Sequence, residues 1–114
     1  MGSAARNDIG HWAQVLVVPL DQPTDPFHGQ ADSISSDGVF VRSNTLVPPH
    51  SACQLVVSRL GTTDPVCTRA RVVHNIPGVG FGCVFTEIKP EMQSRLNRWL
   101  DETPDRIYRV SPAA

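Results

Sequence analysis

The chain is organised around residues 33–41, which read Ser33-Ile34-Ser35-Ser36-Asp37-Gly38-Val39-Phe40-Val41. Small and polar residues surround one isoleucine as far as Gly38, and glycine can take the positive φ angle that a tight turn needs. A β-branched and aromatic run follows at once, which is typical of the start of a strand. The stretch therefore predicts a turn that displays hydroxyls, a carboxylate and backbone N–H groups at a sheet edge.

Length and composition favour one small domain built mainly from strands. The chain has 114 residues, of which 40% are hydrophobic and 18% are charged, and its ten prolines and eight glycines favour short strands over long helices. A formal net charge of −1 gives no general attraction to nucleic acid or to an anionic membrane. No apolar run approaches the ~20 residues that span a bilayer, and no signal peptide is visible. We therefore expect a cytoplasmic protein without membrane insertion and without a nucleic-acid polymer as partner.

Outward from the turn, apolar residues recur at every second position, which is the pattern of a half-buried strand. In one such segment Thr68, Ala70 and Val72 fall on one face, and Arg69 and Arg71 fall on the other. The segments expected as strands are 12–20, 27–34, 39–44, 53–60, 66–74 and 81–88. Six short strands separated by turns predict a small antiparallel barrel or sandwich.

The pattern changes at Pro90, a residue that suits the first turn of a helix. Four apolar residues then recur at helical spacing and form one stripe: Met92, Leu96, Trp99 and Leu100. A helix of about three turns that packs its stripe over an open end or flank of the sheet follows from this spacing. The expected organisation is a flexible arm at 1–11, a folded domain at 12–102 and a flexible tail at 103–114.

The cysteines and histidines show no metal-binding or catalytic spacing. Cys53, Cys67 and Cys83 are odd in number and far apart, which argues against a disulfide framework and favours three reduced, largely buried thiols. The chain contains no Cys-x-x-Cys pair, no His-x-x-x-His pair and no Gly-x-Ser-x-Gly motif. We therefore expect no metal, no cofactor and no enzymatic activity.

Taken together, the turn, a late glycine-aromatic strand and the closing helix resemble a PilZ domain. That family's turn motif is Asp/Asn-x-Ser-x-x-Gly, and residues 33–38 match it at Ser35 and Gly38. The run Gly80-Phe81-Gly82-Cys83-Val84-Phe85 is similar to the family's last strand. The resemblance covers residues 12–101 and implies a six-stranded barrel with a C-terminal helix. It also implies a role in bacterial signalling by cyclic di-GMP, often in motility, type IV pili or surface polysaccharide.

Receptor members of the family hold the messenger with this turn and with an upstream Arg-x-x-x-Arg motif, whose guanidinium groups grip the phosphates. Here Ser33 stands at the first position of the turn motif in place of Asp or Asn. Upstream, Arg6 has a suitable distance from the turn, but Gly10 occupies the place of the second arginine. The ligand-binding candidates implied by the resemblance are Arg6, Ser33, Ser35, Asp37 and Gly38.

Two readings of function follow from these departures. In the first, the domain acts through protein–protein contacts and its messenger site is degenerate, so residues 33–38 form only a connecting turn. In the alternative, it is a genuine cyclic di-GMP receptor with non-standard arginine contacts. The candidate contact surfaces for a protein partner are the proline-rich loop around Pro48-Pro49 and the side of the helix that we expect to be exposed, with Gln93, Arg95, Asn97 and Arg98.

Overall fold

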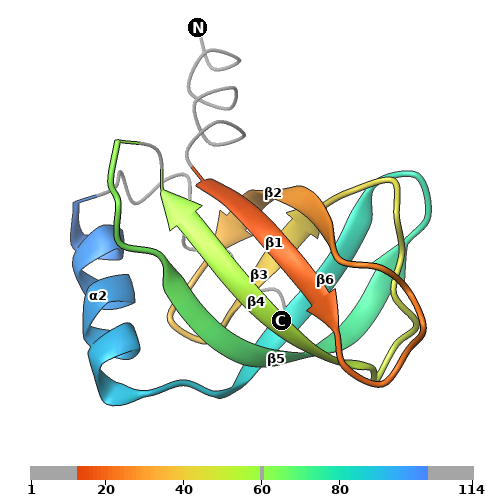
Figure 1. The fold of residues 1–114 in the computed structure, drawn as a ribbon. Coiled ribbons are helices and arrows are strands. Elements are labelled where there is room, and N and C mark those ends of the chain that lie inside the picture. The colour runs from red at the N-terminus through yellow and green to blue at the C-terminus, as the bar shows by residue number, and fades with distance from the viewer. Residues whose placement is uncertain (1–12, 60, 103–114) are drawn as a thin grey trace, which may run out of the picture.

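The computed structural model describes residues 13–59 and 61–102, which form a closed six-stranded antiparallel barrel and one helix (Figure 1). Around the barrel the strand order is β1-β2-β3-β6-β5-β4. The strands are β1 (Ala13–Pro19), β2 (Phe27–Ile34), β3 (Gly38–Arg42), β4 (Ala52–Arg59), β5 (Val66–Ile76) and β6 (Gly80–Glu87). The mainly β fold expected from the sequence is confirmed, and the expected arm at 1–11 and tail at 103–114 lie outside the described residues.

Alternation of buried and exposed residues explains how the strands close on themselves. β1 pairs with β2 and also with β4, and Val15 lies opposite Gly29 on one side and Val57 on the other. Every second residue of β1 is fully buried, as are Leu55 and Val57 of β4, so the core fills the inside of the barrel. In β1 and β4 this alternation places one face of the strand inside the barrel.

The strand limits expected from the sequence agree with the structure to within two residues. The expected strand at 39–44 is the least accurate, because β3 ends at Arg42. Beyond it, the backbone N–H of Thr45 donates to Ser43 Oγ at 3.0 Å, and the N–H of Ser43 donates to the carbonyl of Val79 at 3.0 Å. A local serine turn therefore replaces strand pairing at this point.

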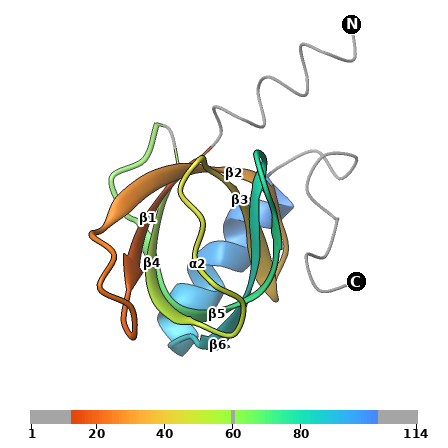
Figure 2. The same cartoon turned by 90° about the vertical axis from the view of Figure 1, so that its right-hand side faces the viewer.

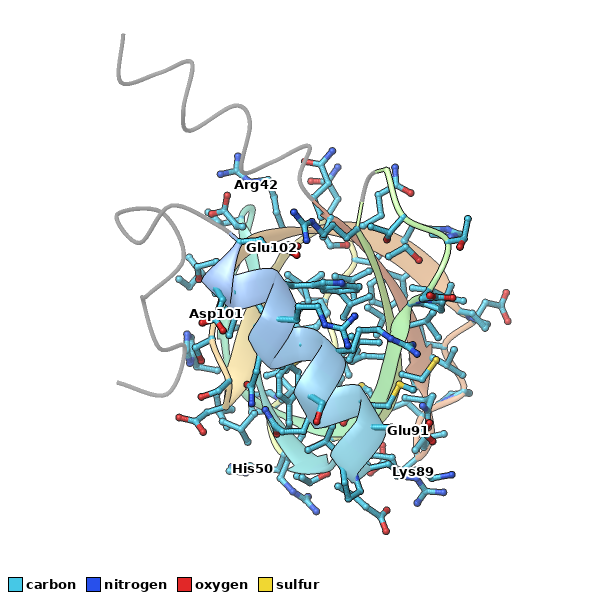
Figure 3. All side chains as sticks on the ribbon, turned by 90° about the vertical axis from the view of Figure 1, so that its left-hand side faces the viewer. Arg42, His50, Lys89, Glu91, Asp101 and Glu102 are labelled. Carbon is cyan, nitrogen blue, oxygen red and sulfur yellow. The ribbon has the colours of Figure 1, made fainter. Side chains whose placement is uncertain are left out.

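Helix α2 (Pro90–Asp101) lies across one end of the barrel (Figures 1 and 2). Its apolar stripe faces inward, since Leu96, Trp99 and Leu100 are buried and Met92 packs against the core. The view onto the helix shows it crossing the mouth of the barrel, with Glu91 near its start and Glu102 just past its end (Figure 3). The expected docking of the helix stripe is thus confirmed, and the helix closes the core at this end.

Two local expectations are wrong. Gly38 does not adopt a positive φ angle, because it already belongs to β3, where it pairs with Val84. Cys67 is exposed, unlike Cys53 and Cys83, because its position on β5 points away from the barrel interior. Among the described residues, none of the helices is long and apolar enough to cross a membrane.

Candidate functional site

The serine-rich turn between β2 and β3 is held largely by its own hydrogen bonds. The backbone N–H of Ser35 donates to the carbonyl of Gly38 at 2.9 Å, and the N–H of Asp37 donates to Ser35 Oγ at 3.2 Å. The carbonyl of Asp37 accepts the N–H of Phe85 at 2.8 Å, which attaches the turn to β6. Ile34 is fully buried and anchors the end of β2. The hydroxyl of Ser35 therefore already accepts a hydrogen bond within the turn.

A β-bulge precedes this turn and changes the direction of one acidic side chain. Ala31 pairs with Val41 and Ser33 pairs with Phe40, so Asp32 is the extra residue on β2. The Asp32 carboxylate accepts a hydrogen bond from the Arg42 guanidinium at 3.0 Å. The carboxylate nearest the first motif position is thus already paired with an arginine of β3.

The structure brings four of the five predicted ligand-binding residues together, because Ser33, Ser35, Asp37 and Gly38 all belong to the β2–β3 hairpin. Arg6 lies outside the described residues. Ser33 and Ser35 are half-buried, Asp37 is exposed, and Gly38 is buried in β3. The exposed side chains of the turn are those of Ser36 and Asp37.

The four residues of the predicted partner surface on α2 differ in how exposed they are. Asn97 and Arg98 are exposed, whereas Gln93 and Arg95 are half-buried. The Arg95 guanidinium donates to the carbonyl of Pro65, so this arginine attaches the helix to the β4–β5 connection. The description of all four residues as an exposed side is therefore wrong for Gln93 and Arg95.

A small cavity of about 180 Å³ lies beside this part of the helix, lined by Arg59, Arg95 and Arg98 together with Thr62, Asp64, Trp99 and Glu102. Arg59 forms an ion pair with Glu102. The three arginines come from two separate elements, β4 and α2, and sequence spacing alone could not show that they meet.

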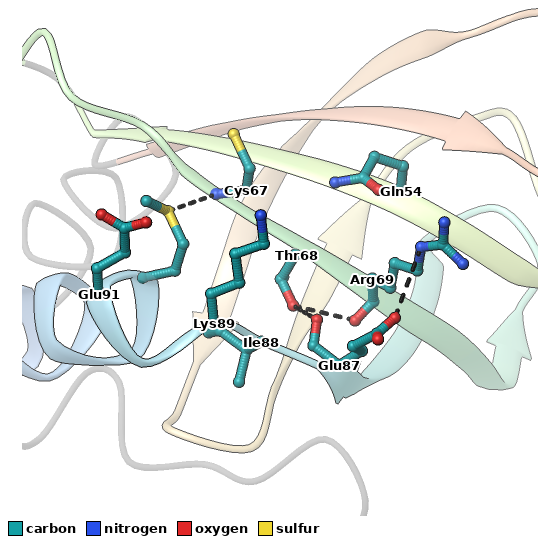
Figure 4. Close-up of a pocket in the computed structure, with 9 residues that line it drawn as sticks. Gln54, Cys67, Thr68, Arg69, Glu87, Ile88, Lys89 and Glu91 are labelled. Carbon is teal, nitrogen blue, oxygen red and sulfur yellow. Dashed lines mark hydrogen bonds and ion pairs between the residues drawn. The ribbon is translucent and has the colours of Figure 1, made fainter.

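A larger cavity of about 510 Å³ lies between the outer face of β4 and β5 and the start of α2 (Figure 4). Cys67, Arg69 and Lys89 line it, and Arg69 faces Glu87 with 3.8 Å between Nε and Oε1. The Thr68 hydroxyl lies within hydrogen-bond distance of the Glu87 carbonyl, at 3.0 Å, which joins β5 to the end of β6. This cavity could not be predicted from the sequence, because its lining comes from segments that are far apart in the chain.

The buried thiols are poor nucleophiles. Burial raises the pKa of Cys53 from 9.0 to about 11, and the nearby Asp21 carboxylate adds to the shift. Burial also raises the pKa of Cys83 strongly, with a further contribution from Cys53. Among the described residues, no three His, Cys, Asp or Glu side chains are grouped as a metal site requires.

These features define a small β-barrel domain, closed at one end by a helix and carrying polar turns and cavities on its outside. A family model of the PilZ domain matches residues 5–102, and the chain belongs to this family. Membership implies a domain of cyclic di-GMP-linked signalling, a class whose members bind and regulate. A comparison with curated proteins found no match.

Proposed function

We propose that this PilZ domain regulates a cyclic di-GMP-linked process such as motility, pilus function or surface behaviour, mainly through contacts with a protein partner. In this proposal the domain works in the cytoplasm, has no catalytic activity and carries a degenerate messenger site. Its own binding of cyclic di-GMP is weak or absent.

The observation that carries the proposal is that two polar side chains of this hairpin, one in the turn and one in β2, already bond within the domain. Ser35 Oγ accepts the N–H of Asp37, and the Asp32 carboxylate holds Arg42. A ligand would have to compete with these bonds. In addition, Ser33 and Gly10 replace two side chains that receptor members use. Each lost contact to a charged group weakens binding by about 1.5–3 kcal/mol, or about ten- to a hundredfold.

The alternative function, a true receptor, is favoured by one observation. The Asp37 carboxylate and the Ser36 hydroxyl remain exposed at the tip of the turn, where the edge of a guanine base could reach them. Arg6 would then provide one phosphate contact, and a second arginine from elsewhere in the chain would replace the residue missing at position 10.

Calorimetric titration of the full chain with cyclic di-GMP distinguishes the two functions. The proposal expects no binding in the micromolar range, and micromolar or tighter binding would refute the degenerate site. If the messenger does bind, Ser35→Ala and Arg6→Ala should both weaken it. Unchanged affinity in both variants would remove the predicted residues from the site.

The partner surface is tested by charge reversal on α2. Arg98 is the exposed arginine of the predicted set, so Arg98→Glu should abolish recovery of a partner that wild-type protein recovers from its own cell extract. Arg69→Glu is the matched control, because Arg69 is also an exposed arginine but lies on β5. Equal recovery with Arg98→Glu and wild type would exclude this surface.

A further inference from the structure

A third cavity, of about 610 Å³, lies near the end of the barrel opposite α2, between β2, the β3–β4 connection and the β5–β6 turn (Figure 1). The side chains that shape it are His28, Gln30, Arg42, Asn44, Thr45 and Val79. Neither Ser35 nor Asp37 belongs to its lining, since their turn lies at the other end of β3. A ligand of this cavity would therefore occupy a different site from the turn.

Strand register explains why this part of the surface is hollow. Gln30 of β2 lies directly opposite Arg42 of β3, and His28 follows two residues away on the same outer face. The third wall is the β5–β6 turn, where Gly78 and Val79 line the cavity and Gly78 has no side chain. The hydrogen bond from the N–H of Ser43 to the carbonyl of Val79, at 3.0 Å, joins the two walls of the cavity.

The charge of the lining favours an anion. Arg42 is the one side chain with a permanent charge among the described residues that line the cavity, and no carboxylate belongs to that lining. The Arg42 side chain is 52% exposed, and its Nη2 donates to Asp32 Oδ1 at 3.0 Å. Because an arginine carries five N–H donors, this single bond orients the group and leaves other donors for a ligand.

The other polar side chains of the lining can form hydrogen bonds with the hydroxyl groups of a ligand. Within the described part of the chain, the side chains of Gln30, Asn44 and Thr45 make no hydrogen bond, so their amide and hydroxyl groups are open to a ligand. Val79 is 40% exposed at the rim and offers an apolar contact. The cavity volume is within the range of ~300–1,000 Å³ usual for small-molecule sites, whereas a phosphate ion alone would leave most of it empty.

We propose that this cavity binds a small, hydroxyl-rich anion of the sugar-phosphate class. Arg42 contacts the phosphate, and the amide and hydroxyl side chains contact the sugar. This site is independent of the function proposed above for the turn and for α2, and either proposal can fail alone.

The test is an NMR titration of the ¹⁵N-labelled full chain with ribose 5-phosphate, inorganic phosphate and ribose in turn. We expect saturable shifts of the Ser43, Thr45 and Val79 amide signals with ribose 5-phosphate, and weaker binding of each of the other two probes. Arg42→Gln should lower the affinity at least about tenfold, because it removes a charge-assisted contact. Arg69→Gln is the control, since Arg69 also faces a carboxylate on the outside of the barrel.

A second variant keeps the test decisive if Arg42→Gln disturbs the fold by leaving Asp32 without its arginine. Asn44→Asp places a negative charge in the exposed lining and should weaken ribose 5-phosphate binding while leaving the remaining spectrum unchanged. The proposal is overturned if ribose 5-phosphate causes no saturable shifts at these amides. It is also overturned if both cavity variants bind like wild type, if Arg69→Gln weakens binding equally, or if ribose or inorganic phosphate binds as tightly.

Discussion

At the scale of single residues, the three cysteines differ in environment although they are alike in sequence. Cys67 is exposed on β5, whereas Cys53 and Cys83 are buried and their pKa values are raised. With a pKa of about 11, only about one Cys53 thiol in a thousand is ionised at pH 8. We therefore predict that iodoacetamide alkylates one thiol rapidly in the native protein at pH 8, as counted by mass spectrometry.

Cys67→Ser should abolish this rapid reaction, and full unfolding in denaturant should make all three wild-type thiols reactive. Rapid labelling of two or three native thiols would contradict the burial of Cys53 and Cys83.

Two glycines of β6 allow another comparison at this scale. A Cβ atom added at Gly80 would lie 2.0 Å from the carbonyl oxygen of Val41, a backbone atom that cannot move without breaking the β3–β6 pairing. A Cβ atom added at Gly82 would instead meet the imidazole of His74 at 2.7 Å, and this half-exposed side chain can shift. Gly80→Ala should therefore destabilise the domain by about 2 kcal/mol or more, and Gly82→Ala by less than about 1 kcal/mol. Urea denaturation of both variants and the wild type measures these changes in the free energy of unfolding.

In Gly82→Ala we expect the His74 ring to shift away from its present position beside Phe40. The His74 ring now lies 6.1 Å from the Phe40 ring, centroid to centroid, over the gap that Gly82 leaves. A variant that is destabilised as much as Gly80→Ala would show that His74 cannot give way.

At the scale of elements, α2 contributes to stability through its buried stripe. Leu96 is fully buried against the barrel, and Ser94 two positions earlier is exposed. Leu96→Ala should lower the free energy of unfolding by about 2–5 kcal/mol because it removes buried methyl groups and leaves a cavity. Ser94→Ala, the matched control on the same helix, should change it by less than about 0.5 kcal/mol. Similar values for the two variants in urea denaturation would mean that the helix is not part of the core.

Strands and helix could be predicted because their signals are periodic and local. The period of two in segments such as 53–60 and the spacing of Leu96 and Trp99 depend only on which face meets the core. The bulge at Asp32 has no such signal, since it follows from the pairing of β2 with a strand whose register the sequence does not show.

The candidate sites were predictable only where they are continuous in sequence. Residues 33–38 could be located from the motif alone. The cavity beside Arg42 could not, because it requires β2 and the turn between β5 and β6 to lie next to the end of β3. For the same reason Arg95 was expected to be exposed, whereas its guanidinium binds the carbonyl of Pro65, thirty positions earlier in the chain.

At the scale of the whole molecule, the barrel and its helix share one core. Closure requires β1 to pair with β4 and β3 to pair with β6, contacts between segments about forty residues apart. The helix covers the end of this core with Trp99, which is 4% exposed. Removing the helix would open the barrel interior to water, so helix and barrel should not unfold separately.

This coupling predicts a single cooperative transition. The chain has two tryptophans, and in a Trp12→Phe variant the remaining indole, Trp99, reports on helix docking. Its fluorescence should change at the same urea concentration as the far-ultraviolet circular dichroism of the strands, because both depend on one core. The Leu96→Ala variant should move both midpoints to lower urea together. If the fluorescence midpoint lies at a clearly lower urea concentration than the circular dichroism midpoint, α2 detaches from an intact barrel. The helix and the barrel would then unfold in separate steps.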